Sequence, residues 1–154
     1  MDLSDLIRPE AILPSLKANS KKQAIQALAE KAATLTGLSE REIFDTLVQR
    51  ERLGSTGVGG GIAIPHGKLA KLDRIVGMFA RLARPIDFEA LDDQPVDLVF
   101  LLLAPEGAGA DHLKSLARIA RLLREPGIAG KLRASGDKSA LYAVLTTGAT
   151  HNAA

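Results

Sequence analysis

The segment from Val96 to Ala104 constrains the fold more than any other part of the chain. It is apolar at every position except Asp97, so both of its faces need cover from other elements. Such a strand is typical of the middle of a sheet with helices on either side. A second apolar segment, Ile75 to Ala83, precedes it, and helix signals lie before and after the pair. This order predicts an α/β fold, a single-domain sandwich with a mixed β-sheet flanked by helices.

Five segments carry helix signals. Ser20 and Ser39 each stand three residues before a Gln or Glu and are predicted to cap helices that end at Gly37 and near Leu53-Gly54. Asp111 is predicted to cap a third helix that stops at Pro126-Gly127. Its expected apolar stripe is Leu113, Leu116, Ala117, Ala120 and Leu123. Shorter helices are expected around 128–134 and 138–147, so residues 1–148 form the domain and 149–154 a loose C-terminal tail.

Composition excludes several classes of protein. With 46% apolar and 25% charged residues, the 154-residue chain is not disordered, and its length suits one domain. The absence of cysteine excludes disulfides, thiol catalysis and cysteine-ligated metals. A net charge of +2 and only 3% aromatic residues argue against nucleic acid as a partner. No apolar run approaches the roughly 20 residues of a membrane span, and the acidic N-terminus lacks signal-peptide features, so no membrane insertion and a cytoplasmic location are expected.

Six of the 14 glycines fall between Gly54 and Gly67. This loop fits neither common nucleotide-binding template, because Leu69 stands where a P-loop needs a hydroxyl and Ile62 where the dinucleotide fingerprint needs glycine. The loop leads to His66, whose backbone is defined by Pro65 through its restriction of Ile64 to an extended conformation. A neutral imidazole there is a candidate nucleophile, although a histidine in such a loop is more often polar filler.

For the other polar residues, the sequence allows either a functional role or an ordinary surface position. His112 lies in the first turn of the third helix, where an anion is favoured, or is a surface histidine. Arg50 and Arg52 suit a phosphoryl group, or belong to a solvated helix end. Two well-separated histidines do not predict a metal site, and His151 is given no role. The cations at helical spacing in the third helix form a solvated face or a docking surface; they are Lys114, Arg118, Arg121 and Arg124.

Residues 50–67, RERLGSTGVGGGIAIPHG, resemble the active-site signature of the enzyme IIA domains of the fructose–mannitol class. These domains belong to the bacterial phosphoenolpyruvate-dependent phosphotransferase system. The stretches Gly54–Gly57 and Ile62–Lys68 are most similar to the nitrogen-regulatory branch of the family. The resemblance continues through residues 85–88, 95–100 and 112–117 and covers nearly the whole chain.

The resemblance implies a set of residue roles. His66 would be the phosphoryl acceptor, modified on Nε2 by an HPr-like phosphocarrier protein. Arg50 would stabilise the phosphoryl group and His112 would be the second active-site histidine. A phosphate-cradling loop would comprise Thr56, Gly59, Gly60 and Gly61. No metal and no cofactor are implied.

The resemblance also implies a phosphohistidine regulator whose phosphorylation state controls partners such as sensor kinases or potassium transporters. Two alternatives remain open at this point. The chain could be the soluble IIA subunit of a fructose- or mannitol-type sugar transporter. It could instead be a binding module whose histidine is never phosphorylated.

Overall fold

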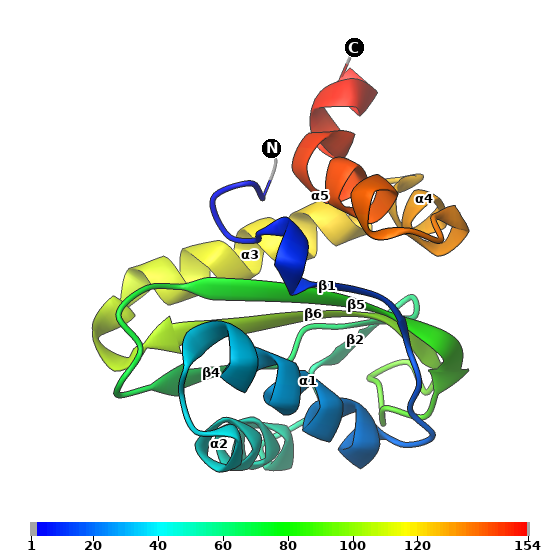
Figure 1. Ribbon diagram of the computed structural model, residues 1–154. Helices are drawn as coiled ribbons and strands as arrows, with labels where there is room; N and C mark the ends of the chain where they lie inside the picture. Colours follow the sequence, from blue (N-terminus) through cyan, green and yellow to red (C-terminus); the bar gives the residue numbers. More distant parts are fainter. Residues whose placement is uncertain (1–2, 154) are drawn as a thin grey trace.

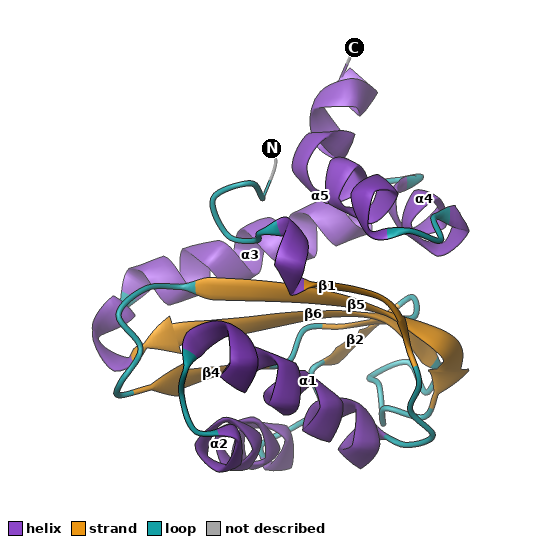
Figure 2. Cartoon of the chain, in the orientation of Figure 1, coloured by secondary structure: helices purple, strands orange, loops and turns teal. Residues whose placement is uncertain are grey.

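The computed structural model describes residues 3–153 and arranges them in layers (Figures 1 and 2). A six-stranded sheet has α1 (Lys21–Thr36) and α2 (Glu40–Arg52) on one face. The other face is covered by α3 (Ala110–Arg124), α4 (Ile128–Ala134) and α5 (Lys138–Ala153). The predicted single α/β domain with a mixed sheet between helices is therefore confirmed.

The sheet is built around β6 (Val96–Pro105). Its order is β1-β5-β6-β3-β2, and β4 also pairs with β6. The other strands are β1 (Ile12–Leu16), β2 (Gly57–Gly59), β3 (Ile62–Ala63), β4 (His66–Leu69) and β5 (Val76–Ile86). β6 is antiparallel to β5 and parallel to β3 and β4. It is buried from Leu98 to Ala104, as expected for a central strand covered on both faces.

The sequence patterns predicted no strand before the first helix, but the structure has one. After a short 3-10 helix, Pro9–Ala11, the chain forms β1, which pairs in parallel with β5 before α1 begins. β1 contains Pro14, which cannot donate to a neighbouring strand. An edge strand tolerates it, and its carbonyl accepts a hydrogen bond from Arg81 Nη1 at 3.2 Å. Because Pro14 interrupts the apolar pattern, the sequence did not predict this strand.

The capping predictions for α1 and α2 are confirmed. Ser20 Oγ accepts the amide N–H of Gln23 at 3.2 Å, and Ser39 Oγ accepts that of Glu42 at 3.2 Å. Each bond satisfies an amide that has no partner within its own helix. α1 ends at Gly37 in the left-handed conformation, and α2 ends one residue before Leu53.

The third helix differs from its prediction in both start and face. α3 follows Gly109, so Asp111 lies inside its first turn instead of capping it. Of the predicted stripe, Leu123 is buried and Leu116 and Ala120 pack partly against the core, whereas Leu113 is 68% exposed and Ala117 is exposed. The other buried residues of the helix are His112, Ser115, Ile119 and Leu122. Both sets have helical spacing, so periodicity alone could not choose between them. α5 also continues to Ala153 instead of ending near 147, and takes in most of the segment expected to be a loose tail, because no proline interrupts it.

Candidate active site around His66

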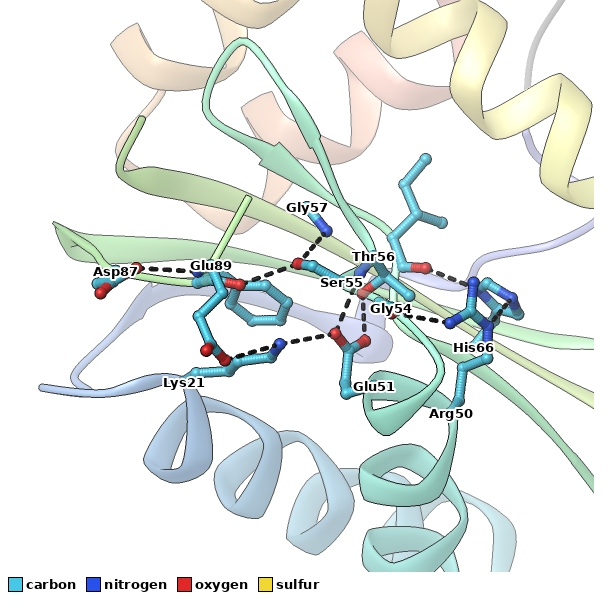
Figure 3. Close-up of polar contacts among 12 residues, drawn as sticks. Lys21, Arg50, Glu51, Gly54, Ser55, Thr56, Gly57, His66, Asp87 and Glu89 are labelled. Carbon is cyan, nitrogen blue, oxygen red and sulfur yellow. Dashed lines mark hydrogen bonds and ion pairs between the residues drawn. The ribbon is translucent and has the colours of Figure 1, made fainter. Parts of the chain in front are cut away.

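Arg50 and His66 meet where the last turn of α2 faces the start of β4 (Figure 3). Arg50 Nε donates a hydrogen bond to His66 Nε2 at 3.1 Å, and Arg50 Nη1 donates to the carbonyl of Gly54 at 2.9 Å. The approach of α2 to β4 depends on Gly67, since a Cβ there would lie 2.6 Å from Thr46 Cγ2. The arginine cannot give up its proton, so Nε2 of His66 must be the acceptor in this bond.

The contact of the other ring nitrogen of His66 indicates the same tautomer. His66 Nδ1 lies 2.9 Å from the carbonyl oxygen of Ile64 and donates to it, because a carbonyl can only accept. Burial lowers the pKa of His66, and the charge of Arg50 lowers it further; the bond to Ile64 and the charge of Glu51 oppose these effects in part. His66 is therefore neutral at pH 7, with a proton on Nδ1 and a lone pair on Nε2.

His112 faces His66 from the first turn of α3, with the two ring centroids 5.5 Å apart. It is 5% exposed, and Nδ1 has no hydrogen-bond partner within residues 3–153. Burial lowers the pKa of His112, and electrostatic repulsion from the neighbouring His66 ring when it is protonated, and from the Lys68 ammonium, lowers it further. The N-terminus of α3, the positive end of the helix dipole, thus lies close to the candidate nucleophile.

An open hollow of about 460 Å³ exposes this site. Thr46, Gln49, Arg50, Leu53, His66, Gly67, Lys68 and His112 line it, and none of these residues is acidic. Lys68 was missed as a site residue, although its signal was available: it follows His66 by two residues on β4, so both side chains leave the same face of the strand. The hollow therefore combines a neutral imidazole with two cations and suits an anionic group.

A second cluster on the same turn of α2 was also missed. Glu51 is only 6% exposed on its side chain and binds Lys21 Nζ at 2.9 Å. Its carboxylate also accepts the amide N–H of Thr56 at 3.0 Å and the Thr56 hydroxyl (Figure 3). Thr56, which was expected to cradle phosphate, is itself 3% exposed and engaged by Glu51. In the sequence Glu51 stands between two arginines, which made it look like part of a solvated helix end.

The three consecutive glycines lie away from His66. Gly59 ends β2, and Gly60 and Gly61 form the turn to β3, where the amide of Gly60 donates to Asp92 Oδ2 at 3.0 Å. Ile62 pairs with Leu98 on β6 and His66 with Leu102, which puts this turn about 13 Å or more along the sheet from the imidazole. The expectation that Gly59, Gly60 and Gly61 cradle a phosphoryl group at His66 is not compatible with this register.

The other basic residues singled out in the sequence are mostly exposed, and one of them forms an ion pair. Arg52 is exposed, in contrast to the half-buried Arg50. Arg118 forms a two-pronged ion pair with Asp5, at 2.7 and 2.9 Å, whereas Lys114, Arg121 and Arg124 are exposed on α3. Within the described part of the chain, no three His, Asp or Glu side chains gather as metal ligands would, and no helix is long and apolar enough to cross a membrane.

Comparison with known proteins gives consistent matches. Residues 5–148 match the family described as the phosphoenolpyruvate-dependent sugar phosphotransferase system, EIIA 2. The chain is 71% identical over 145 residues to a nitrogen regulatory protein of Bradyrhizobium diazoefficiens, covering 94% of this chain and 95% of the relative. It is 35% identical over 145 residues to a fructose-specific EIIA component of Haloferax volcanii, with 94% of each covered. The crystal structure of nitrogen regulatory protein IIA-Ntr from Neisseria meningitidis superposes with a TM-score of 0.87 at 34% identity, over 92% of this chain and 97% of that one.

Proposed function

The chain belongs to the EIIA type 2 family of the phosphotransferase system, which transfers phosphoryl groups through a histidine, and we propose that Nε2 of His66 is its phosphoryl acceptor. The observation that carries the proposal is the hydrogen bond from Arg50 Nε to that nitrogen. It requires a lone pair on the ring atom nearer the arginine. A cation that would contact the incoming phosphoryl oxygens is then already in place.

The transfer step follows from these positions. The Nε2 lone pair attacks the phosphorus of a phosphohistidine on the carrier, a new N–P bond forms, and the old N–P bond breaks with its electron pair remaining on the carrier imidazole. Positive charge that develops on the His66 ring is stabilised by the bond from Nδ1–H to Ile64. Arg50 and the α3 N-terminus stabilise the phosphoryl oxygens, so the protein contributes mainly alignment and charge.

The rim of the hollow suits a protein donor. EIIA domains exchange phosphoryl groups with phosphocarrier partners of the same system. Here Leu53 lines the hollow with Arg50 and is 85% exposed, and Leu113, which follows His112 in the sequence, is 68% exposed. An exposed leucine in the lining of a cationic hollow, with a second exposed leucine on the helix that contains His112, supports docking of a small HPr-like carrier in the cytoplasm, because apolar anchors surrounded by complementary charge are typical of transient interfaces.

The acceptor is tested with labelled phosphoenolpyruvate, enzyme I, the carrier and His66→Ala. The wild type should acquire acid-labile, base-stable phosphate and the variant none. His112→Ala serves as the matched control, since it removes the neighbouring imidazole and leaves the acceptor present. Label that persists in His66→Ala, or that maps to His112 in the wild type, would contradict the assignment.

We further propose that the modification regulates partner proteins, as the similarity to nitrogen regulatory proteins suggests. A phosphoryl group on His66 adds nearly two negative charges to the hollow that the exposed Leu53 lines, which would exclude a partner that recognises the unmodified surface. His66→Glu should then weaken binding to such a target, a sensor kinase or a potassium transporter for example, whereas His66→Ala should retain binding.

The alternative is a IIA component that only relays phosphate to a sugar transporter, and the relative from Haloferax volcanii favours it. Titration of each isolated target with the wild type, His66→Ala and His66→Glu separates the two. Equal affinity of all three for every target would support the relay and contradict regulation by the phosphorylation state.

A further inference from the structure

Glu51 is a buried carboxylate outside the hollow, and the transfer step described above does not use it. It lies on the last turn of α2, directly after Arg50, and receives two donors from Thr56 and one from Lys21. Burying a carboxylate is costly unless donors compensate it, and three donors do so here. The contacts join the end of α2 to the segment that precedes β2.

The hydrogen bonds continue from Thr56 to the acceptor. The carbonyl of Thr56 accepts the amide N–H of Ile64 at 2.9 Å, and the carbonyl of Ile64 accepts Nδ1–H of His66 at 2.9 Å. Two neighbouring residues of α2 therefore reach opposite sides of one imidazole. Arg50 bonds Nε2 directly (Figure 3), and Glu51 is linked to Nδ1 through Thr56 and Ile64.

We propose, resting on the proposed function, that Glu51 and Thr56 are positioning residues that hold the Ile64 carbonyl against Nδ1–H of His66. The carbonyl keeps the proton on Nδ1, which leaves the lone pair on Nε2 for the phosphorus. Without this support the segment shifts and only the bond from Arg50 holds the tautomer, so in the molecules where that bond opens the proton can move to Nε2. Those molecules have no nucleophile facing the carrier.

If Glu51 and Thr56 only stabilised the fold, a different result would be expected. Loosening their contacts would lower the free energy of unfolding and leave the folded molecules with the same tautomer and the same rate. The positioning role requires a change in the native ring itself. The tautomer and the rate at saturating carrier distinguish the two roles.

The test compares Thr56→Val, which keeps the side-chain shape and removes the hydroxyl donor, with Thr56→Ser, which keeps the hydroxyl. Thr146→Val is the matched control, because that buried hydroxyl donates within α5 to the Tyr142 carbonyl and has no link to His66. ¹⁵N NMR of His66 reports the tautomer in the folded protein. Single-turnover labelling over a range of carrier concentrations separates the maximal rate from the half-saturating concentration.

Thr56→Val should lower the maximal rate about tenfold at an unchanged half-saturating concentration and give a mixture of tautomers. Thr56→Ser should restore both, Glu51→Gln should act in the same direction as Thr56→Val, and Thr146→Val should change neither property. Wild-type rate and tautomer in Thr56→Val would overturn the positioning role. If instead the wild type accepts no label, the proposed function fails, and the tautomer measurement still decides on the positioning.

Discussion

The glycine-rich stretch divides into two halves, and each half is bonded by its own arginine. In the half that contains the site, Arg50 donates to the Gly54 carbonyl and to His66. In the turn between β2 and β3, Arg133 donates to the Gly60 carbonyl at 2.8 Å and forms two bonds to Asp97, at 2.8 and 3.0 Å. Arg133 thus has a carboxylate partner, whereas no ion pair links Arg50 to any carboxylate in residues 3–153.

This difference separates the glycines of a structural turn from those beside the candidate site. The turn half is closed by groups from α4 and from the loop that contains Asp92, so its polar atoms have partners within the protein. The site half holds a cation whose carboxylate-binding capacity is unused. A guanidinium that has no carboxylate partner and lies beside a neutral imidazole favours an external anion, whereas a guanidinium paired with a carboxylate indicates only a stable turn.

The largest contrast is expected from replacing the two arginines. Arg50→Ala should slow phosphoryl acceptance about 100-fold or more with little change in stability, because it removes the cation at the transferring group. Arg133→Ala should leave acceptance unchanged and lower the free energy of unfolding by about 1 kcal/mol. Single-turnover labelling and urea unfolding measure the two effects, with Arg52→Ala as an exposed control. Equal slowing by Arg50→Ala and Arg52→Ala would indicate a general docking patch instead.

Alanine in the turn should affect stability alone. Gly61 has a φ of +81°, and a Cβ there would overlap Arg133 Nη2 and lie 3.0 Å from Asp97 Oδ1. Gly60 has a φ of +67° with no atom within 4 Å of its Cβ position. Gly61→Ala should therefore cost about 2 kcal/mol and Gly60→Ala about 1 kcal/mol, measured by urea unfolding. If folded Gly60→Ala accepted much less phosphate than the wild type, this turn would take part in binding the phosphoryl group after all.

Lys68 should have a smaller effect than Arg50, because its ammonium is exposed and screened. Lys68→Gln is expected to slow acceptance several-fold, roughly the effect of 1 kcal/mol, and this loss should shrink as salt is added. Lys71→Gln is the control, since Lys71 is also exposed but pairs with Glu42 at 3.7 Å. If both substitutions slowed acceptance equally, the cause would be the overall charge of the protein and not a contact made by Lys68 in the hollow.

The two halves should also respond to different ranges of pH. The lowered pKa of His66 means that the unfolded chain binds a proton near pH 6.5 while the folded chain does not, so stability falls as the pH drops through that value. In the turn, hydrogen bonds from the amides of Gly60 and Gln94 lower the pKa of Asp92, so its contribution is lost only as the pH falls below about 3.8. NMR titration should place the His66 midpoint below 6.5, and Arg50→Met should raise it.

Much of the fold was predictable because its signals are local. The serine caps of α1 and α2 and the apolar run of β6 each depend on neighbouring residues, and all three predictions are confirmed. β1 escaped prediction because it is stabilised by pairing with a strand more than sixty residues later. The buried face of α3 escaped because Leu113 and His112 both fit a helical stripe, and only the packed structure shows which one points inward.

The candidate site was predictable to the extent that the resemblance named its residues. Arg50, His66 and His112 come together as expected. The turn glycines do not join them, because their partners Asp92 and Arg133 lie far away in the sequence. Glu51 could not be recognised as buried, since a carboxylate between two arginines resembles any solvated helix end until Thr56 and Lys21 close over it.

The hydrogen bond between Arg50 and His66 occupies the same lone pair that phosphorus would use. One lone pair cannot serve both, so the guanidinium must leave Nε2 as the donor arrives and can then contact the incoming oxygens. In the protein without a phosphoryl group, the bond from Arg50 keeps the lone pair of Nε2, the proposed nucleophile, from being protonated by solvent. The loaded and empty states would then differ in the partner of one side chain, so that phosphorylation could be sensed at the surface without movement of the sheet beneath it.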